Sequence, residues 1–287
     1  MSKTKTAEKP METGKAETAI ATIDETAKNE IAVMGNEAED AFGEFAGEGF
    51  ENVTQKDLLI PRITILQKLS PQLSSRKPEY IKGATEGLFC DVATSDTFPN
   101  IDFLPVLFRV DYLEWAPRAS GKGLVAIHSD PSILDQCIKN EKMQYFNGEN
   151  IVMETAQWFG LNMTADWRRS FIPLSSTGLR RSRAWMTLAT NEKIVRRDGS
   201  RFTPPLFYRI YHLSSVETSN SSGEWFALKA DRGPTLPEYN TKNWQDIKME
   251  CIEFRKSLLA GTVKADLASM AGDPDQPDES ASNERAM

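Results

Sequence analysis

Short stretches of alternating or densely branched apolar residues dominate the middle of the chain and predict β-strands. These stretches are residues 62–67, 87–93, 101–115, 151–163, 168–174, 206–213 and 224–229. Turn signals at Pro99-Asn100 and at residues 220–223 predict two hairpins, the first between residues 87–93 and 101–115 and the second between the last two stretches. Pro105 predicts a sheet edge or a bulge, because proline donates no ladder hydrogen bond.

Three segments carry helical signals. Asp130 before Pro131 predicts a short helix over residues 131–139, and Ser176 predicts the cap of a helix over residues 177–190. The apolar residues Trp244, Ile247, Cys251, Phe254 and Leu258 recur every three or four positions, which predicts a helix over residues 241–259 that docks on the β core. Many short strands, two short helices and one long final helix predict an α+β domain built on a partly closed antiparallel barrel.

Charge divides the chain into three segments. Residues 1–52 hold five basic and twelve acidic residues, and residues 261–287 hold two basic and six acidic residues. Both segments are poor in large apolar residues, so we expect disordered acidic tails on either side of one folded domain. That domain, residues 53–260, carries 27 basic and 23 acidic residues, although the whole 287-residue chain has a net charge of -7.

Several classes of protein are disfavoured by what the sequence lacks. No run reaches the roughly 18 apolar residues of a membrane helix, and the first residues are polar, so we expect a cytoplasmic protein without membrane contact. Three cysteines and two histidines are too few and too widely spaced for a disulfide framework or a metal site, and we expect no metal or other cofactor. The motifs of phosphate-loop, metal-dependent and cysteine-nucleophile enzymes do not occur, which favours a binding protein over an enzyme.

The candidate functional segment is residues 164–209, where ten cations stand against three acids with aromatic residues between them. Phosphates bind guanidinium and ammonium groups and unpaired bases stack on flat side chains, so this mixture is typical of a groove for single-stranded nucleic acid. The stacking candidates are Trp167, Trp185, Phe207 and Tyr208. The candidates for phosphate contact are Arg168, Arg169, Arg180, Arg181, Arg183, Arg196, Arg197, Arg201 and Arg209. A second interpretation, in which the aromatics fill the core and the arginines form a solvated face, is equally consistent with these residues.

The acidic tails add a regulatory hypothesis to this interpretation. A flexible anionic tail can cover a basic groove until a polyanion displaces it, and the released tail can then recruit basic partner proteins.

The segments Asp57–Pro71 and Tyr80–Gly87 resemble the opening of a family of tailed-bacteriophage single-stranded DNA-binding proteins, with Leu-Ile-Pro-Arg at residues 59–62 as the most distinctive motif. Phe171–Arg180 and Leu206–Leu213 are similar to later parts of that family, so the resemblance extends over residues 53–260. It implies an OB-like barrel and non-enzymatic, sequence-tolerant binding of single-stranded DNA. It also implies a role in phage replication and recombination in the cytoplasm of the infected bacterial host, with replication or recombination proteins as partners of the acidic C-terminal tail.

Two other functions remain open at the level of sequence. The first is a virion or assembly protein that works through protein contacts. The second is a nuclease or recombination enzyme whose site carries no recognised motif, although the small number of potential metal ligands counts against it.

Overall fold

A computed structural model describes residues 48–49, 51, 59–141, 143–220 and 223–270. The chain divides into two units, Met1–Val53 and Thr54–Met287, and every helix and strand named below belongs to the second. In the first unit the described residues form a turn, in which the backbone N–H of Gly49 donates to Glu51. Apart from this turn, the predicted tail over residues 1–52 lies outside the described residues, and so do residues 271–287.

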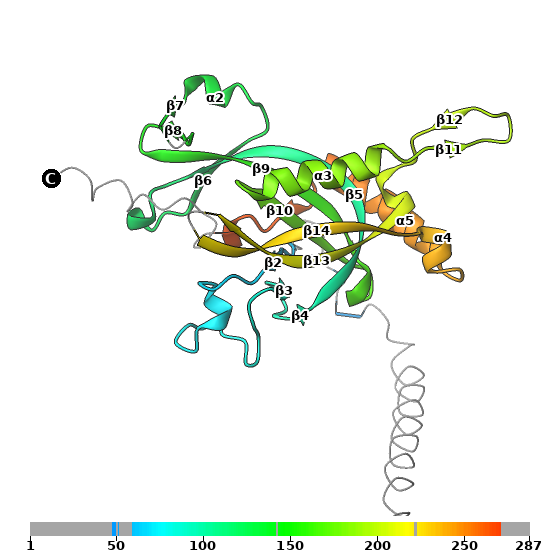
Figure 1. The fold of residues 1–287 in the computed structure, drawn as a ribbon, viewed down its shortest axis with the longest axis horizontal. Helices are drawn as coiled ribbons and strands as arrows, with labels where there is room; N and C mark the ends of the chain where they lie inside the picture. The colour runs from blue at the N-terminus through cyan, green and yellow to red at the C-terminus, as the bar shows by residue number, and fades with distance from the viewer. Residues whose placement is uncertain (1–47, 50, 52–58, 142, 221–222, 271–287) are drawn as a thin grey trace, which may run out of the picture. The chain divides into compact units, whose positions relative to one another are not determined.

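The largest element is an eight-stranded antiparallel sheet (Figure 1). Its strands are β5 (Asn100–Trp115), β6 (Leu124–His128), β7 (Ile138–Lys139), β8 (Tyr145–Asn147), β9 (Asn150–Asn162), β10 (Arg168–Ser175), β13 (Arg209–Asn220) and β14 (Gly223–Thr235). The strand order is β14-β13-β5-β9-β8-β7, with β10 paired to β9 and β6 paired to β5.

Smaller sheets and helices surround this sheet. The small sheets are β2 (Ile63–Ile65) with β3 (Phe89–Asp91) and β4 (Thr97–Phe98), β11 (Ile194–Val195) with β12 (Arg201–Phe202), and β1 (Leu59–Ile60) with β15 (Lys264–Ala265). The α-helices are α2 (Ile133–Gln136), α3 (Gly178–Thr190), α4 (Leu236–Tyr239) and α5 (Trp244–Leu259). The 3₁₀ turns are η2 (Pro71–Leu73), η3 (Arg118–Ser120), η4 (Met163–Ala165), η5 (Leu206–Tyr208) and η6 (Ala268–Met270). No described helix has the length and apolar character needed to cross a membrane.

The main sheet is strongly curled, and α3 bridges the two ends of the curl. Helix α3 packs against both β10 and β14, which are four strand pairings apart in the order β10-β9-β5-β13-β14. In a flat sheet those two strands would lie about 19 Å apart, farther than one helix about 10 Å wide can bridge. The five strands therefore bend until α3 touches both ends, which gives the predicted α+β class with a curled antiparallel sheet.

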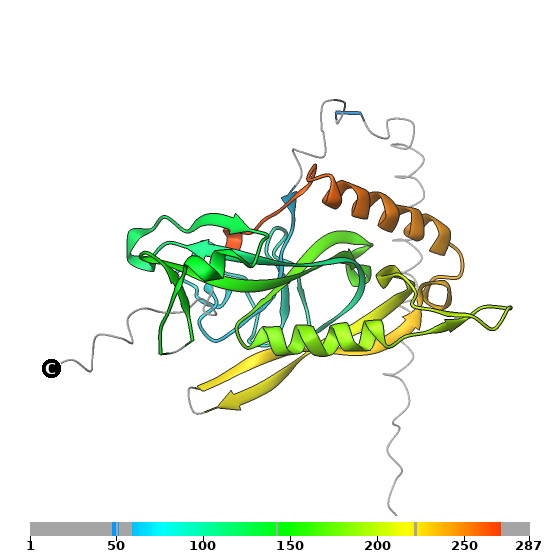
Figure 2. The same ribbon diagram turned by 90° about the horizontal axis from the view of Figure 1, so that it is seen from above.

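Alternation of side chains along the strands produces a hydrophobic cluster on each face of the sheet. On β9, Trp158 belongs to the cluster that contains Trp185 of α3, whereas the next residue, Phe159, belongs to the cluster that contains Phe254 of α5. Figure 2 shows α3 and α5 on opposite sides of these strands. The predicted apolar stripe of the last helix is confirmed, because Ile247, Cys251, Phe254 and Leu258 are buried and Trp244 is partly buried.

The predicted hairpin between residues 87–93 and 101–115 is wrong. Strand β3 pairs with β2 and β4, whereas β5 pairs with β6, β9 and β13. The chain turns earlier than Pro99 because the Asp91 carboxylate accepts hydrogen bonds from the backbone N–H groups of Ala93 and Thr94, and Ser95 takes a positive φ of 63°.

The bulge predicted at Pro105 is confirmed by a register shift between Pro105 and Leu107 in the pairing with β9. Gly160 lies opposite, where an added Cβ would meet the Leu104 carbonyl oxygen at 2.3 Å. The second predicted hairpin is also confirmed and is longer than expected, with Asn220 paired to Gly223. The first three residues of the strand predicted over residues 206–213 form η5, and the strand begins at Arg209. The helix expected over residues 131–139 is shorter than predicted, because α2 ends at Gln136 and β7 follows.

The folded domain extends past residue 260, where composition placed the start of the acidic tail. Strand β15 pairs in parallel with β1, and Val263, Leu267 and Met270 are buried in the same cluster as α5. The buried Arg62 guanidinium donates to the hydroxyl of Ser269 at 3.1 Å and to its carbonyl oxygen at 2.8 Å. The Leu-Ile-Pro-Arg segment is therefore tied to residues 261–270, and the folded domain continues past residue 260 through Met270.

Candidate nucleic-acid interface

The sequence from α3 through the β11–β12 hairpin is rich in basic side chains. Helix α3 contains three arginines and no acid, and the hairpin continues beyond the end of the helix (Figure 1). We call this region the α3–hairpin surface. It comprises Arg180, Arg181, Arg183, Lys193, Arg196, Arg197 and Arg201, all exposed except the half-buried Arg181.

Little negative charge balances this surface. Residues 178–202 contain two acids, Glu192 and Asp198. Glu192 is bound by Arg209, whose Nε lies 2.7 Å from Glu192 Oε2. Asp198 accepts hydrogen bonds from the side chain and backbone of Ser200, which lower its pKa and keep it ionised. Glu154 of β9 also faces α3, with its Oε1 3.6 Å from Arg183 Nη2. Both side chains are exposed, so this ion pair contributes little to stability.

Three of the predicted phosphate contacts lie elsewhere and bind acids of the protein itself. Arg169 Nε lies 2.6 Å from Glu250 Oε1, and its guanidinium stands 5.2 Å from the centre of the Phe254 ring. Arg209 binds Glu192 and the carbonyl oxygen of Gly233. The third, Arg168, is held most extensively. These contacts give the three arginines partners within the protein, and their contact with phosphate stays a prediction.

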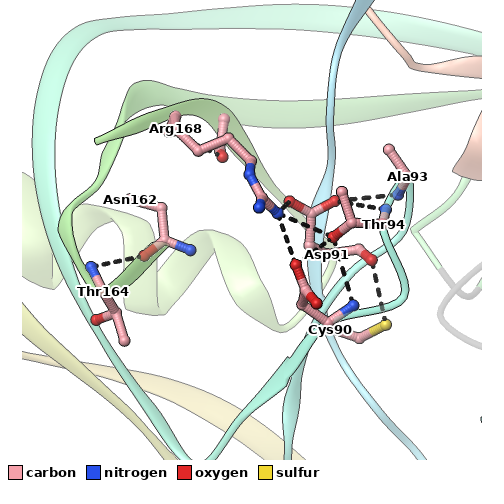
Figure 3. A network of polar contacts seen from close by, with 9 residues as sticks. Cys90, Asp91, Ala93, Thr94, Asn162, Thr164 and Arg168 are labelled. Atoms are coloured by element: carbon pink, nitrogen blue, oxygen red, sulfur yellow. Dashed lines mark hydrogen bonds and ion pairs between the residues drawn. The ribbon is translucent and has the colours of Figure 1, made fainter. Parts of the chain in front are cut away.

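Figure 3 shows how Arg168 is fixed. Its Nη1 donates to Asp91 Oδ2 at 3.1 Å, to Thr94 Oγ1 at 2.9 Å and to Asp96 Oδ2 at 2.8 Å. Asp91 is fully buried, so removal of this cation would leave a buried carboxylate without its ionic partner. Arg168 therefore joins β10 to the β3–β4 turn.

This network leads to a pH-dependent prediction. Hydrogen bonds from Arg168 and then Thr94 lower the pKa of Asp96, so Asp96 stabilises the fold above its unfolded-state pKa and loses that effect as pH falls through the folded-state value. Asp96→Asn is expected to lower the free energy of unfolding by at most about 1 kcal/mol at pH 7. The difference between the variant and the native chain is expected to shrink below about pH 4. Urea unfolding over a pH series measures this. The control is Glu149→Gln at the β8–β9 turn, and an equal, pH-independent cost in both variants would contradict the prediction.

The predicted stacking aromatics do not form one exposed platform. Trp185 is 1% exposed, and its ring stacks on Trp158 with centroids 4.0 Å apart, so it belongs to the core and not to a DNA surface. Trp167 and Phe207 are partly buried against the cluster beneath α5. Tyr208 is half-exposed, with the Arg209 guanidinium 6.0 Å from its ring centre.

The model of one protein family, described as Pam3 phage gp34-like protein, matches residues 28–246. The match covers well over half of the chain. The chain belongs to the Pam3 phage gp34-like family. This membership places the chain in a bacteriophage protein family, which is the coarser part of what the sequence resemblance implied. No curated protein and no solved structure matched the chain.

In this gp34-like chain the structure also brings to the basic surface two aromatic residues that were not among the stacking candidates, Phe202 and Trp225. Arg196 stands 4.4 Å from the centre of the Phe202 ring in the β11–β12 hairpin. Trp225 is half-exposed on β14, directly opposite Thr218 on β13, and Thr218 Oγ1 accepts a hydrogen bond from Arg181 at 3.3 Å. The alternation of residues 224–229 predicted the strand, but only the position of α3 links Trp225 to the arginines.

Within the described residues of the gp34-like chain, the potential metal ligands lie apart and two of the three cysteines are buried. No three His, Cys, Asp or Glu side chains converge there as metal ligands. Burial raises the pKa of Cys90 to about 11 and that of Cys251 to about 12, so both are neutral, unreactive thiols near pH 7. The two histidines bind separate acids, His128 to Glu114 and His212 to Asp102.

Proposed function

We propose that this chain binds single-stranded DNA without reading its sequence, as a non-enzymatic protein of phage DNA replication and recombination. The observation that carries the proposal is the α3–hairpin surface, where seven cations lie on one helix and one hairpin. Of the two acids within residues 178–202, Glu192 is bound by Arg209, which leaves Asp198. Clustered arginines and lysines bind polyanions by releasing the counterions of the phosphates. Phosphates are the same in every sequence, so such contacts are sequence-tolerant.

Two further features support DNA as the polyanion. The curl of β10-β9-β5-β13-β14 is consistent with an OB-like barrel, an architecture that binds oligonucleotides. The phage family fits a protein that works where single strands are exposed during replication.

The proposal extends to the acidic segment 271–287, which holds five acids and one arginine. This segment competes with DNA for the α3–hairpin surface and, once displaced, contacts basic proteins of replication or recombination. Deletion of residues 271–287 is then expected to raise the affinity for DNA at low salt.

The direct test is fluorescence anisotropy of a labelled oligo-dT, titrated at several salt concentrations without metal and with duplex DNA and RNA as competitors. Preferential binding of the single strand, with log affinity falling by about 0.7 per phosphate contact for each unit of log salt, supports the proposal. Absence of binding at low salt contradicts it and directs attention to the virion.

A charge-reversal variant tests the surface itself. Arg196→Glu with Arg197→Glu is expected to lower affinity equally for unrelated sequences and to flatten the salt slope by about 1.4, which corresponds to two lost phosphate contacts. The matched control is Arg255→Glu with Lys256→Glu, an exposed pair on α5 that should leave affinity unchanged. Equal losses in both variants would indicate an effect of net charge instead of a binding surface.

A further inference from the structure

The β11–β12 hairpin projects from the domain as a two-stranded arm (Figures 1 and 2). Among the described strands, β11 and β12 pair only with each other. Every residue from Val195 to Arg201 is exposed. The extended backbone from Lys193 to Arg196 spans about 10 Å at roughly 3.3 Å per residue, and the turn over residues 197–199 lengthens the arm further.

The base of the arm is fixed to the domain. Arg209 of β13 binds Glu192, with its Nε 2.7 Å from Glu192 Oε2. Lys193 Nζ donates to the carbonyl oxygen of Thr190 at 3.3 Å and to the hydroxyl of Thr203. These contacts set the direction in which the arm leaves the C-terminal end of α3.

The arm carries arginines on both of its faces and in its turn. Arg196 and Phe202 share one face, with the guanidinium 4.4 Å from the centre of the ring. Arg201 precedes Phe202 in β12 and lies on the opposite face, because successive residues of a strand alternate. Arg197 follows in the turn. Within the part of the chain that the structure describes, the guanidinium groups of Arg197 and Arg201 have no partner.

The major groove of B-form DNA, about 12 Å wide and about 8.5 Å deep, admits a two-stranded ribbon. Phosphates line both walls of a groove, so arginines on both faces of the ribbon find partners there, whereas a flat surface would leave one face unused. We propose that the arm enters the major groove of a duplex segment that adjoins the single strand on α3. The inference rests on the proposed function and extends its substrate to the junction between single-stranded and double-stranded DNA.

The acid in the turn fits an arm that enters the groove tip first. Asp198 is held in the turn by the backbone N–H of Ser200, which donates to its carboxylate at 2.9 Å. The tip lies deepest in the groove, where cytosine and adenine present amino groups, and farthest from the phosphates. Arg196 and Arg201, nearer the base of the arm, lie at the level of the phosphates.

The experiment measures fluorescence anisotropy of labelled probes with the full chain. The probes are oligo-dT, a blunt duplex, and the same duplex carrying the same oligo-dT as a 3′ or a 5′ overhang. One of the junctions is expected to bind at least about 100-fold more tightly than either part alone, because two linked sites are engaged together. Methyl green, a major-groove ligand, should displace the duplex part of the junction from the arm, and netropsin, a minor-groove ligand, should not.

A shortened arm tests the role of the hairpin. Gly-Gly in place of residues 196–200 joins the two strands by a two-residue turn, and the preference for the junction over oligo-dT is expected to disappear. The readout is this ratio of affinities, because on oligo-dT alone the same arginines contact single-strand phosphates.

A point substitution keeps the arm intact. Arg201→Gln is expected to reduce the salt slope of junction binding by about 0.9, which corresponds to one lost contact with a duplex phosphate. The matched control is Arg255→Gln, an exposed arginine on α5 that should leave this slope unchanged.

The outcomes separate this inference from the proposed function. If the native chain binds oligo-dT but neither junction more tightly, or if the shortened arm keeps the junction preference, groove entry is overturned and single-strand binding stands. Displacement by netropsin and not by methyl green also overturns entry into the major groove. If the duplex and the junctions bind and oligo-dT does not, the proposed function fails while groove entry stands. Binding to none of the probes overturns both.

Discussion

Trp185→Ala is expected to lower the free energy of unfolding by about 3–5 kcal/mol, the usual cost of removing a large buried aromatic side chain. Trp185 stacks on Trp158 and meets the rings of Phe103 and Tyr211 edge-on at 5.9 and 5.7 Å. These partners come from β9, β5 and β13, so one side chain ties α3 to the middle of the curl. Alanine would leave a cavity between α3 and these strands, and the contacts that hold the helix on the sheet would be lost.

Urea unfolding followed by circular dichroism measures this loss. The matched control is Met249→Ala on α5, where a half-exposed side chain should change stability by no more than about 0.5 kcal/mol. A stable Trp185→Ala variant with sharply reduced DNA affinity would contradict the burial and restore the stacking role that the sequence predicted.

Removal of residues 261–287 is expected to lower the free energy of unfolding by about 3 kcal/mol or more relative to removal of residues 271–287 alone. The longer deletion exposes the surface that Val263, Leu267 and Met270 cover, and each buried apolar side chain contributes about 1.5–3 kcal/mol. It also leaves β1 without its parallel partner and Arg62 without Ser269. Tail function is therefore best tested with the shorter deletion.

The two deletions are compared by thermal unfolding and by oligonucleotide titration. Equal melting temperatures would contradict the inclusion of residues 261–270 in the core. A lower DNA affinity in the shorter deletion would contradict competition between the acidic segment and DNA.

Local patterns predicted those parts of the fold that depend on neighbours in sequence. The stripe of α5, the β13–β14 hairpin and the bulge at Pro105 follow from helical periodicity, turn chemistry and the missing proline donor. The strands that pair with β3 could not be predicted from these local patterns. The turn after β3 is set by the buried Asp91 carboxylate, which accepts two backbone hydrogen bonds. Residues 261–270 were assigned to the tail because three apolar positions are too few to outweigh acidic composition.

In the candidate site, too, the sequence predicts what depends on nearby residues and misses what depends on distant ones. Whether an arginine is available to phosphate depends on acids far away in sequence, since Asp91 and Glu250 lie 77 and 81 positions from the arginines that they bind. The burial of Trp185 was accessible from sequence, because Ser182, Trp185 and Ala189 form the inner stripe of α3. Trp225 carried no such signal, since its relation to Arg181 depends on where α3 crosses the sheet.

The contact between Arg62 and Ser269 joins positions 207 residues apart, so it has a consequence for the order of events during synthesis. At about 5–20 residues per second, Ser269 is added roughly 10–40 s after Arg62. Throughout that interval β1 has no β15 beside it, and its backbone edge is open to other chains. We therefore expect the domain to complete its folding only after translation has passed residue 270, when β15 and the residues that follow it can close over β1.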